Sequence, residues 1–250
     1  MSPPLLGTTL PDTTLPALWL VRHGESTWNI SGLAQGHNDE AELTERGLRQ
    51  AAQAARQFRD RPVRAIYASD LRRAQQTAAE FAAVLGLPVY ADARLRERSL
   101  GVLEGSAHKT IGPSVTGLAD GLVIDPDTRP PAGESVRDLY LRAAAFCDDL
   151  AAGLRDGHGT VRGLAGLVPA STGPASTGPA GTGPTGTRPT GAGPASNGGD
   201  VLVIAHGGTV RVLDAYARGV PVDQMPWRPV DNATIVRIPE FGTTLRGGNR

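Results

Sequence analysis

An arginine and a histidine stand together where a short apolar run ends. The run 18–21 (LWLV) is followed directly by Arg22 and His23. In an open α/β sheet, ligands bind just beyond the carboxyl ends of the strands, which is where this pair would lie. An arginine can hold a phosphate through a bidentate fork, and a neutral imidazole can attack phosphorus. The pair therefore suggests phosphate chemistry, although so few residues are a weak signal alone.

Three further groups of polar residues are expected at the same edge. Arg73 follows the apolar run 63–68, Glu97 lies in a loop after a short strand, and His206 follows the run 201–205. Because parallel strands bring their carboxyl ends to one edge, these side chains can converge there. The set suits a phosphate monoester: guanidiniums hold the dianion, an imidazole acts as nucleophile, and a carboxyl group protonates the leaving oxygen.

The segments that must position these residues alternate between strands and helices. Strands are expected at 17–21, 63–68, 89–90, 201–205 and 235–238. Helices are expected at about 45–58, 71–85, 134–154 and 209–218, with Thr44 capping the first, Ser69 and Asp70 capping the second, and Gly86 ending it. Residues 92–133 are expected to form loops and short helices. The alternation predicts an α/β domain with a largely parallel sheet.

The composition excludes several classes of partner and compartment. Lys+Arg and Asp+Glu are both 25, so no overall positive field favours nucleic acid or an anionic membrane. Cys147 is the only cysteine, which gives no argument for an oxidising compartment. The N-terminus does not have the pattern of a secretory signal, and no run approaches the roughly 18 apolar residues of a membrane span. The expected location is the cytoplasm.

Two segments are expected to lie outside the folded part. Residues 1–16 contain four prolines and are expected to form a flexible tail. Residues 171–195 repeat a pentapeptide that is rich in glycine and proline, and such a composition cannot bury a core. We therefore expect one domain over 17–250, interrupted by a disordered insertion at about 157–199. A proline-rich docking arm is the alternative role for this insertion.

Six motifs, in order along the chain, carry a resemblance to a known family. They are LVRHGEST, LTERG, SDLRRAQQTA, LRERSLGVLEG, GES and IAHGG. With them the chain resembles the histidine phosphatase superfamily, the phosphoglycerate mutase-like group, over about 17–110 and 200–238. The resemblance implies a three-layer α/β/α sandwich with a mostly parallel sheet and a small cap from the region after Gly105.

The resemblance also implies a role for each member of the convergent set. His23 would be the nucleophile that becomes phosphohistidine, and Arg22 and Arg73 would hold the phosphoryl oxygens. His206 would be a second phosphate-binding histidine, and Glu97 would be the general acid and base. No metal or other cofactor is implied, because the arginines and His206 take the place of a metal.

The chemistry of the residues agrees with these roles. Flanking arginines disfavour the imidazolium form of His23, so the neutral nucleophile is available near pH 7. His206 has the opposite need, since a protonated ring is a good donor to phosphate and bound phosphate would favour protonation.

Further residues match the family's positions around the phosphate pocket or add polar groups beside it. They are Asn29, Gln35, Gly36, Arg98 and Gly207. A turn role explains Asn29 and the pair Gln35-Gly36 equally well.

Other chemistry-bearing side chains are assigned simpler roles. Arg72 is expected to be a solvated charge on its helix. His37, His108 and His158 are expected to be exposed or structural. Trp28 lies beside the site in sequence and packs either the pocket wall or the core.

The cap region separates a phosphatase from a mutase. Ser99 and Leu100 stand where the family's mutases carry aromatic and basic residues, His108 falls near a mutase lysine, and the cap before Gly133 is short. A mutase must keep water from its phosphohistidine, and a short open cap admits it. A metal-independent phosphatase of small phosphate monoesters is therefore favoured, and Arg96 with Arg98 suggests an anionic one.

Two alternatives stay open. One is a phosphoglycerate mutase, and the other is a non-catalytic phospho-ligand or protein-binding module with the repeat as its docking arm. The expected partner is a small phosphorylated metabolite, without nucleic acid or membrane, and a homodimer stays open.

Overall fold

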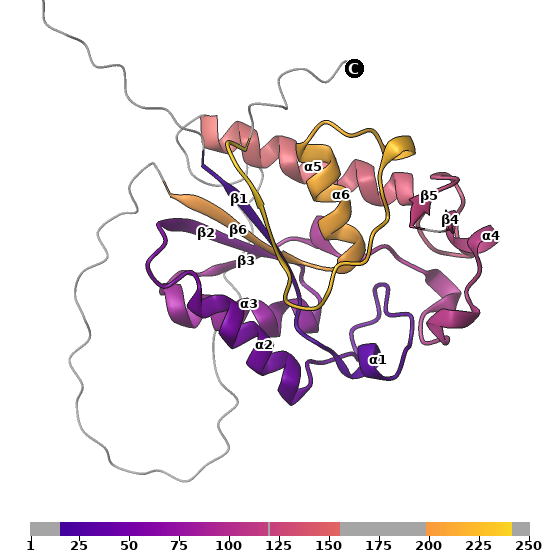
Figure 1. Cartoon of the computed structure of the whole chain (residues 1–250), viewed down its shortest axis with the longest axis horizontal. Coiled ribbons are helices and arrows are strands. Elements are labelled where there is room, and N and C mark those ends of the chain that lie inside the picture. Colours follow the sequence, from indigo (N-terminus) through magenta and orange to yellow (C-terminus); the bar gives the residue numbers. More distant parts are fainter. Residues whose placement is uncertain (1–15, 120, 156–198, 242–250) are drawn as a thin grey trace, which may run out of the picture.

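A five-stranded sheet forms the centre of the protein. The computed structural model describes residues 16–119, 121–155 and 199–241 (Figure 1). The strand order is β3-β2-β6-β1-β7. The strands are β1 (Leu18–Arg22), β2 (Val63–Ala68), β3 (Val89–Ala91), β6 (Asp200–Ala205) and β7 (Ile235–Ile238). The first four strands in this order pair in parallel, and β7 runs antiparallel to β1. The predicted α/β class with a mostly parallel sheet is confirmed.

Helices cover both faces of the sheet, as Figure 1 shows. Helices α5 (Val136–Arg155) and α6 (Gly207–Ala217) lie on one face, and α2 (Glu45–Arg56) and α3 (Arg72–Leu85) lie on the other. Successive side chains of a strand point to opposite faces, so Leu18 and Leu20 pack in the α5/α6 core, while Trp19 and Val21 pack in the α2/α3 core. Both faces of the strands are therefore buried, which explains their continuous apolar runs.

The helix boundaries follow local capping signals in most places. The hydroxyl of Thr44 accepts the amide N–H of Gly47 at 2.9 Å, which caps α2 as predicted. Gly86 ends α3 in the left-handed conformation (φ 68°), where glycine has no steric penalty.

The predicted cap of α3 is wrong. Its N-cap is Leu71, not Ser69 or Asp70, and its first amide N–H, that of Arg72, donates to the carboxylate of Asp39 from another loop. Ser69 and Asp70 hydrogen-bond elsewhere: Ser69 contacts His206 and Asp70 pairs with Arg96. A capping group supplied by a distant loop leaves no local signal.

Two other helices start a residue or two from their predicted positions. Helix α6 begins at Gly207 rather than Thr209, because His206 is its N-cap. Helix α5 begins at Val136. At its start, the amide N–H of Ser135 donates to the carboxylate of Asp138, and the amide N–H of Asp138 donates to the hydroxyl of Ser135.

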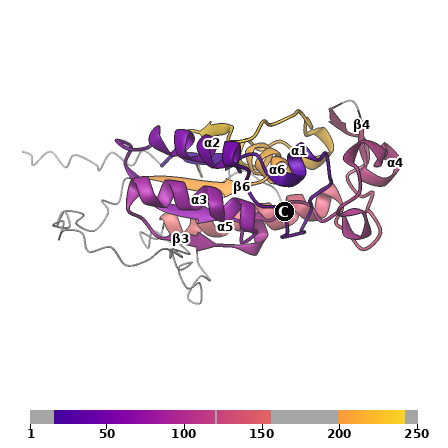
Figure 2. The same ribbon diagram turned by 90° about the horizontal axis from the view of Figure 1, so that it is seen from below.

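Short elements fill the region after β3, as predicted, and form a cap beyond the carboxyl ends of the strands. The 3-10 helices η1 (Ala93–Leu95), η2 (Gly101–Leu103) and η3 (His108–Thr110) come first. They are followed by α4 (Pro113–Thr116) and the two-stranded pair β4 (Leu118–Ala119) and β5 (Leu122–Val123). Figure 2 shows α4 and β4 at one end of the molecule. The remaining short elements are α1 (Thr27–Ile30) and η4 (Val222–Gln224).

The remaining predictions concern the two segments expected to be flexible, Cys147 and membrane-spanning helices. Residues 1–15 of the expected tail and 156–198 of the expected insertion, with His158, lie outside the described residues. Cys147 is fully buried on α5, where burial raises the pKa of its thiol. Of the helices described, none is both long and apolar enough to cross a membrane.

Candidate active site

Sheet register places the two histidines side by side. In the parallel pairing of β1 with β6, Arg22 lies opposite Ala205, and the amide N–H of His23 donates to the carbonyl of Ala205 at 2.9 Å. His23 and His206 are the residues that immediately follow these two strands. Their ring centroids are 5.2 Å apart, with an angle of 62° between the ring planes. The register between two strands that end together therefore sets the distance between the two histidines.

The ring of His23 is buried and oriented by a backbone carbonyl. Its Nδ1 lies 2.7 Å from the carbonyl oxygen of Gly24, and a carbonyl can only accept, so Nδ1 carries the hydrogen. The unprotonated Nε2 then keeps its lone pair. Burial, followed by the charges of Arg73 and Arg22, lowers the pKa of His23 well below its usual value near 6.5. The ring is therefore neutral near pH 7, with the lone pair of Nε2 free.

Two arginines flank this ring without a carboxylate partner among the described residues. Arg22 ends β1 and donates through Nη1 to the carbonyl of Val230. Arg73, in the first turn of α3, donates to the carbonyls of Gly36 and Asn38, each at 2.8 Å. Burial lowers the pKa of Arg73 to about 10, which still leaves it charged at neutral pH. Carbonyl oxygens orient both guanidiniums without neutralising their charge.

Glu97 lies at the N-terminus of α6. One carboxylate oxygen accepts the amide N–H of Gly208 and the other accepts the amide N–H of Arg98, both at 2.8 Å. A Cβ on Gly208 would lie 2.2 Å from the Glu97 carboxylate, so this approach requires glycine. The amide groups and dipole at the start of a helix favour a negative group there.

The loop that carries Glu97 is held by the half-buried guanidinium of Arg142. This guanidinium donates to the carbonyls of Arg94, Arg96 and Glu97 at 2.6–2.8 Å, and pairs with Glu134 at 2.8 Å. The hydroxyl of Thr209 on α6 also donates to the carbonyl of Arg96 at 2.7 Å. Helices α5 and α6 thus fix a segment that has no regular structure of its own.

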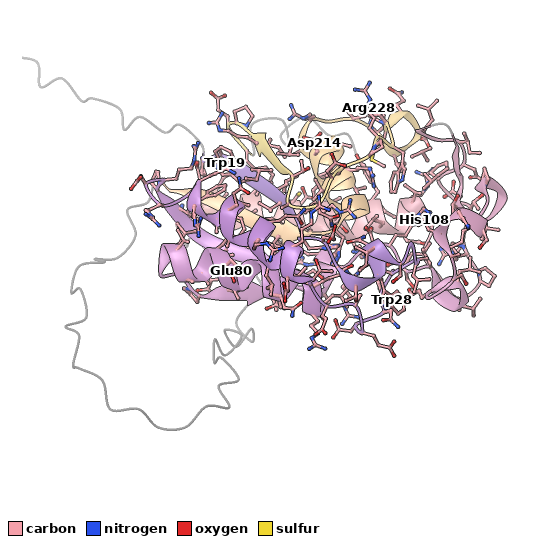
Figure 3. All side chains as sticks on the ribbon, turned by 60° about the horizontal axis from the view of Figure 1, so that its bottom comes forward. Trp19, Trp28, Glu80, His108, Asp214 and Arg228 are labelled. Atoms are coloured by element: carbon pink, nitrogen blue, oxygen red, sulfur yellow. The ribbon has the colours of Figure 1, made fainter. Side chains whose placement is uncertain are left out.

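Both histidines, both flanking arginines and Glu97 line one cavity of about 470 Å³ between the strand ends and the cap. The ten predicted site residues are all among its lining residues: Arg22, His23, Asn29, Gln35, Gly36, Arg73, Glu97, Arg98, His206 and Gly207. Figure 3 shows His108, another lining residue, toward the cap end of the molecule and Trp19 toward the opposite end.

Three buried nitrogens at this site have no hydrogen-bond partner among the described residues. They are Nε of Arg22, Nε of Arg73 and Nδ1 of His206. No other buried side-chain nitrogen or oxygen in the described part of the chain is left in this state. Buried polar groups are normally paired, so three unpaired ones around one cavity indicate a site built for a polar ligand. Because guanidinium groups only donate and carry a positive charge, the two arginines favour an anionic acceptor.

Asn29, Gln35 and Gly36 also have structural roles. Asn29 forms a capping box with Ser26 at the start of α1, and Gln35 accepts a hydrogen bond from the same serine at 3.1 Å. Gly36 has a φ of 48°, and a Cβ there would lie 2.2 Å from the carboxylate of Glu104. These three residues shape the cavity wall as well as line it.

Neighbouring arginines separate into paired and unpaired groups. Arg96 binds Asp70 through two hydrogen bonds and does not line the cavity, contrary to the suggestion that it adds charge there. Arg98 is buried, and its Nη1 donates to the carbonyl of Thr116 in α4 at 2.7 Å. Arg72 is largely exposed and pairs with Glu42 at 2.7 Å.

His37 has a structural contact, and Trp28 does not line the cavity. Nε2 of His37 lies 2.8 Å from the carbonyl oxygen of Glu97, so this side chain helps to hold the Glu97 loop. Trp28 is half-buried but is not among the cavity-lining residues, whereas Trp227 is.

Sequence reasoning missed four residues that the fold brings to the site. Arg211 lines the cavity one turn into α6, and its guanidinium lies 4.9 Å from the ring centroid of Trp227. Asn232 donates to the carbonyls of His23 and Gly24 and to Asn29. Ser69 contacts His206, and Arg142 holds the Glu97 loop. Only Arg211 had a local signal in the sequence, as a basic residue five positions after His206.

Comparison with known proteins points to one family. The sequence model of the histidine phosphatase superfamily (branch 1) matches residues 18–162 and 192–244. A Klebsiella pneumoniae protein named probable phosphoglycerate mutase GpmB is 42% identical over 142 residues, or 55% of this chain and 66% of that protein. The alignment therefore spans slightly less than two thirds of that relative's length.

Solved structures with the same fold include two mycobacterial proteins. Mycobacterial glucosyl-3-phosphoglycerate phosphatase in complex with VO3 is 28% identical, with a TM-score of 0.65 over 89% of this chain and 90% of that chain. A protein described as mycobacterial hydrolase 1 is 27% identical, also with a TM-score of 0.65, over 91% of this chain and 93% of that chain.

The two buried histidines predict a stability that falls in mild acid. Their folded-state pKa values lie below the unfolded value near 6.5, so the unfolded chain binds more protons as the pH drops below 6.5. The stability is fully present above about pH 6.5 and should fall by up to about 1.36 kcal/mol per pH unit for each histidine. Urea unfolding at about pH 7.5 and about pH 5.5 measures this.

A double variant, His23→Gln with His206→Gln, serves as the comparison. It should lose most of this pH dependence. An unchanged slope would show that other groups cause the acid sensitivity.

Proposed function

The chain belongs to the histidine phosphatase superfamily, and on that premise we propose that it is a phosphatase that hydrolyses small phosphate monoesters through a phosphohistidine on His23. The observation that carries this proposal is the convergence of three unpaired buried nitrogens on the cavity that contains the neutral His23 ring. Solved structures of the same fold include one described as a phosphatase complexed with VO3, a phosphate-like anion.

In the first step, Nε2 of His23 attacks phosphorus. A P–N bond forms, the P–O bond to the leaving group breaks, and Glu97 supplies a proton to the departing oxygen. The Nδ1 hydrogen stays on the ring, and the Gly24 carbonyl that accepts it stabilises the positive charge that develops there. Arg22, Arg73 and His206 bind the phosphoryl oxygens.

In the second step, water replaces the leaving group. The Glu97 carboxylate takes a proton from the water as its oxygen attacks phosphorus, and the P–N bond breaks. Phosphate leaves and His23 returns to its neutral state. In this scheme the cations that stabilise the transferred phosphoryl group are the chain's own arginines.

The charges around the cavity support a substrate with a second anionic group. One acidic side chain, that of Glu97, lines the cavity together with four arginines: Arg22, Arg73, Arg98 and Arg211. None of these arginines forms a salt bridge with a described residue. With Glu97 protonated, as the first step requires, the lining side chains carry a net charge of about +4, while a phosphate monoester supplies about −2. A leaving group that carries a carboxylate or a further phosphate would balance the remainder.

A mutase is the second candidate, because the curated relative that is 42% identical is named a probable phosphoglycerate mutase. The short cap favours hydrolysis, since water can reach a phosphohistidine beneath it. Interconversion of 2- and 3-phosphoglycerate that is faster than release of phosphate would establish the mutase instead.

His23→Ala should remove hydrolysis. The nucleophile forms the covalent intermediate, so we expect kcat to fall by about 10⁴-fold or more, in the range seen when other enzymes lose a nucleophile. Release of phosphate from p-nitrophenyl phosphate and trapping of acid-labile phosphohistidine measure this. Wild-type activity should persist in EDTA and be inhibited by vanadate. Undiminished turnover in the variant would sink the assignment of the nucleophile.

Glu97→Gln should separate substrates by their leaving groups. An amide cannot donate a carboxyl proton, so alkyl phosphates should slow by about 10²–10⁴-fold, whereas p-nitrophenyl phosphate, which leaves without a proton, should slow much less. Single-turnover rates on the two substrates measure the difference. Equal losses on both would exclude Glu97 as the general acid.

Arg211→Gln should lower kcat/KM selectively for esters that carry a second anion. We expect a loss of roughly tenfold or more on 3-phosphoglycerate relative to p-nitrophenyl phosphate, because a charged hydrogen bond to the leaving group is removed. Arg218→Gln is the matched control, since Arg218 is the C-cap of the same helix but pairs with Asp214 at the surface. A loss of equal size on both substrates would place Arg211 at the phosphoryl group.

A further inference from the structure

A buried serine contacts the second histidine from the neighbouring strand. Ser69 directly follows β2, and its amide N–H donates to the carbonyl of Ile204 on β6 at 3.0 Å. Its hydroxyl oxygen lies 2.8 Å from Nε2 of His206, and the two residues are 0% and 1% exposed. The sheet pairing therefore fixes this contact, and neither side chain can exchange it for water.

The remaining hydrogen bonds of the two side chains decide where the hydrogen atoms lie. The hydroxyl oxygen of Ser69 already accepts the amide N–H of Leu71 at 3.3 Å. If Nε2 of His206 also donated to it, the serine hydrogen would have no acceptor among the described residues. If the serine donates to Nε2 instead, its donor and acceptor are both used, and the imidazole hydrogen lies on Nδ1.

The choice matters because Nδ1 is the atom left for a ligand. Nδ1 of His206 is buried and unpaired, and the residue lines the same cavity as Arg22 and Arg73. A lone pair at this atom would repel a phosphoryl oxygen, whereas an N–H would donate a hydrogen bond to it. The arrangement therefore needs the tautomer with hydrogen on Nδ1.

We propose that the hydroxyl of Ser69 fixes His206 as the neutral Nδ1–H tautomer, so that the ring donates to a phosphoryl oxygen without carrying a charge. Ser69 is then a positioning residue that acts through His206, and this inference rests on the proposed phosphatase function. Burial and the charge of Arg73 also lower the pKa of His206 well below 6.5. The expectation that His206 acts as a protonated donor is replaced by a neutral donor.

The tautomer can be read directly by NMR in the full chain. Long-range ¹H–¹⁵N spectra of ¹⁵N-histidine-labelled protein near neutral pH should show Nδ1 protonated and Nε2 unprotonated for the signals that disappear in His206→Ala. An Nε2–H tautomer of His206 in the wild-type chain would overturn the proposal without the need for any other variant.

Ser69→Ala should release this constraint. We expect the His206 signals to change toward the Nε2–H form and the affinity for inorganic phosphate, measured by calorimetry, to fall roughly tenfold. Ser135→Ala is the matched control, because Ser135 is also a buried serine but caps α5 through Asp138. It should change neither the tautomer nor the affinity for phosphate.

A double-variant comparison separates positioning from a structural effect. If Ser69 acts through His206, adding Ser69→Ala to His206→Ala should cause no further loss of phosphate affinity. An equal loss in both backgrounds would overturn the proposal. These readouts need no turnover, so a wild-type chain that shows the Nδ1–H tautomer and binds phosphate but hydrolyses no monoester would overturn the proposed function alone.

Discussion

Positive charge is buried at this site on arginines that form no salt bridge with a described residue, and much of the surrounding structure serves to hold it. Burial of an unpaired charge is costly, so each guanidinium must find other oxygen atoms. Backbone carbonyls supply them: those of Val230, Gly36 and Asn38 for the two arginines beside His23, and that of Thr116 for Arg98. The carbonyl dipoles orient the cations and leave their full charge for an anion. Burial, together with the charges of these cations, lowers the pKa of both histidines well below its usual value.

The need for backbone carbonyls that orient these guanidiniums explains why irregular segments around the site are held by many hydrogen bonds. A carbonyl can orient a guanidinium only if its own loop is fixed, and the loops at the site have little regular structure. Arg142 does this for the Glu97 loop by binding three of its carbonyls, and its own charge is balanced by Glu134. Arginines that pair with a carboxylate therefore stabilise the loops around the site, and arginines without such a partner among the described residues line the cavity.

The sequence allowed prediction of the parts of the site that follow from local order. Apolar runs that end in polar residues located the strand ends, and parallel pairing then implied that His23 and His206 meet. The partners of the arginines could not be predicted, because they depend on contacts between distant segments. Arg96 and Arg98 are close in the sequence, yet one pairs with Asp70 and the other faces the cavity. Asn232 is separated from His23 by 209 residues and carries no local signal.

Strand β6 begins at Asp200, whose carboxylate accepts hydrogen bonds from the amide of Ala17 at 2.9 Å and the indole of Trp19 at 2.7 Å. This anchor lies at the edge of the sheet opposite His206, about 20 Å away at roughly 3.3 Å per residue. Strand β6 therefore enters the sheet at the end remote from the cavity, and its 6 residues separate that end from His206. This end of the sheet offers a place to insert a foreign domain or a reporter at a distance from the chemistry.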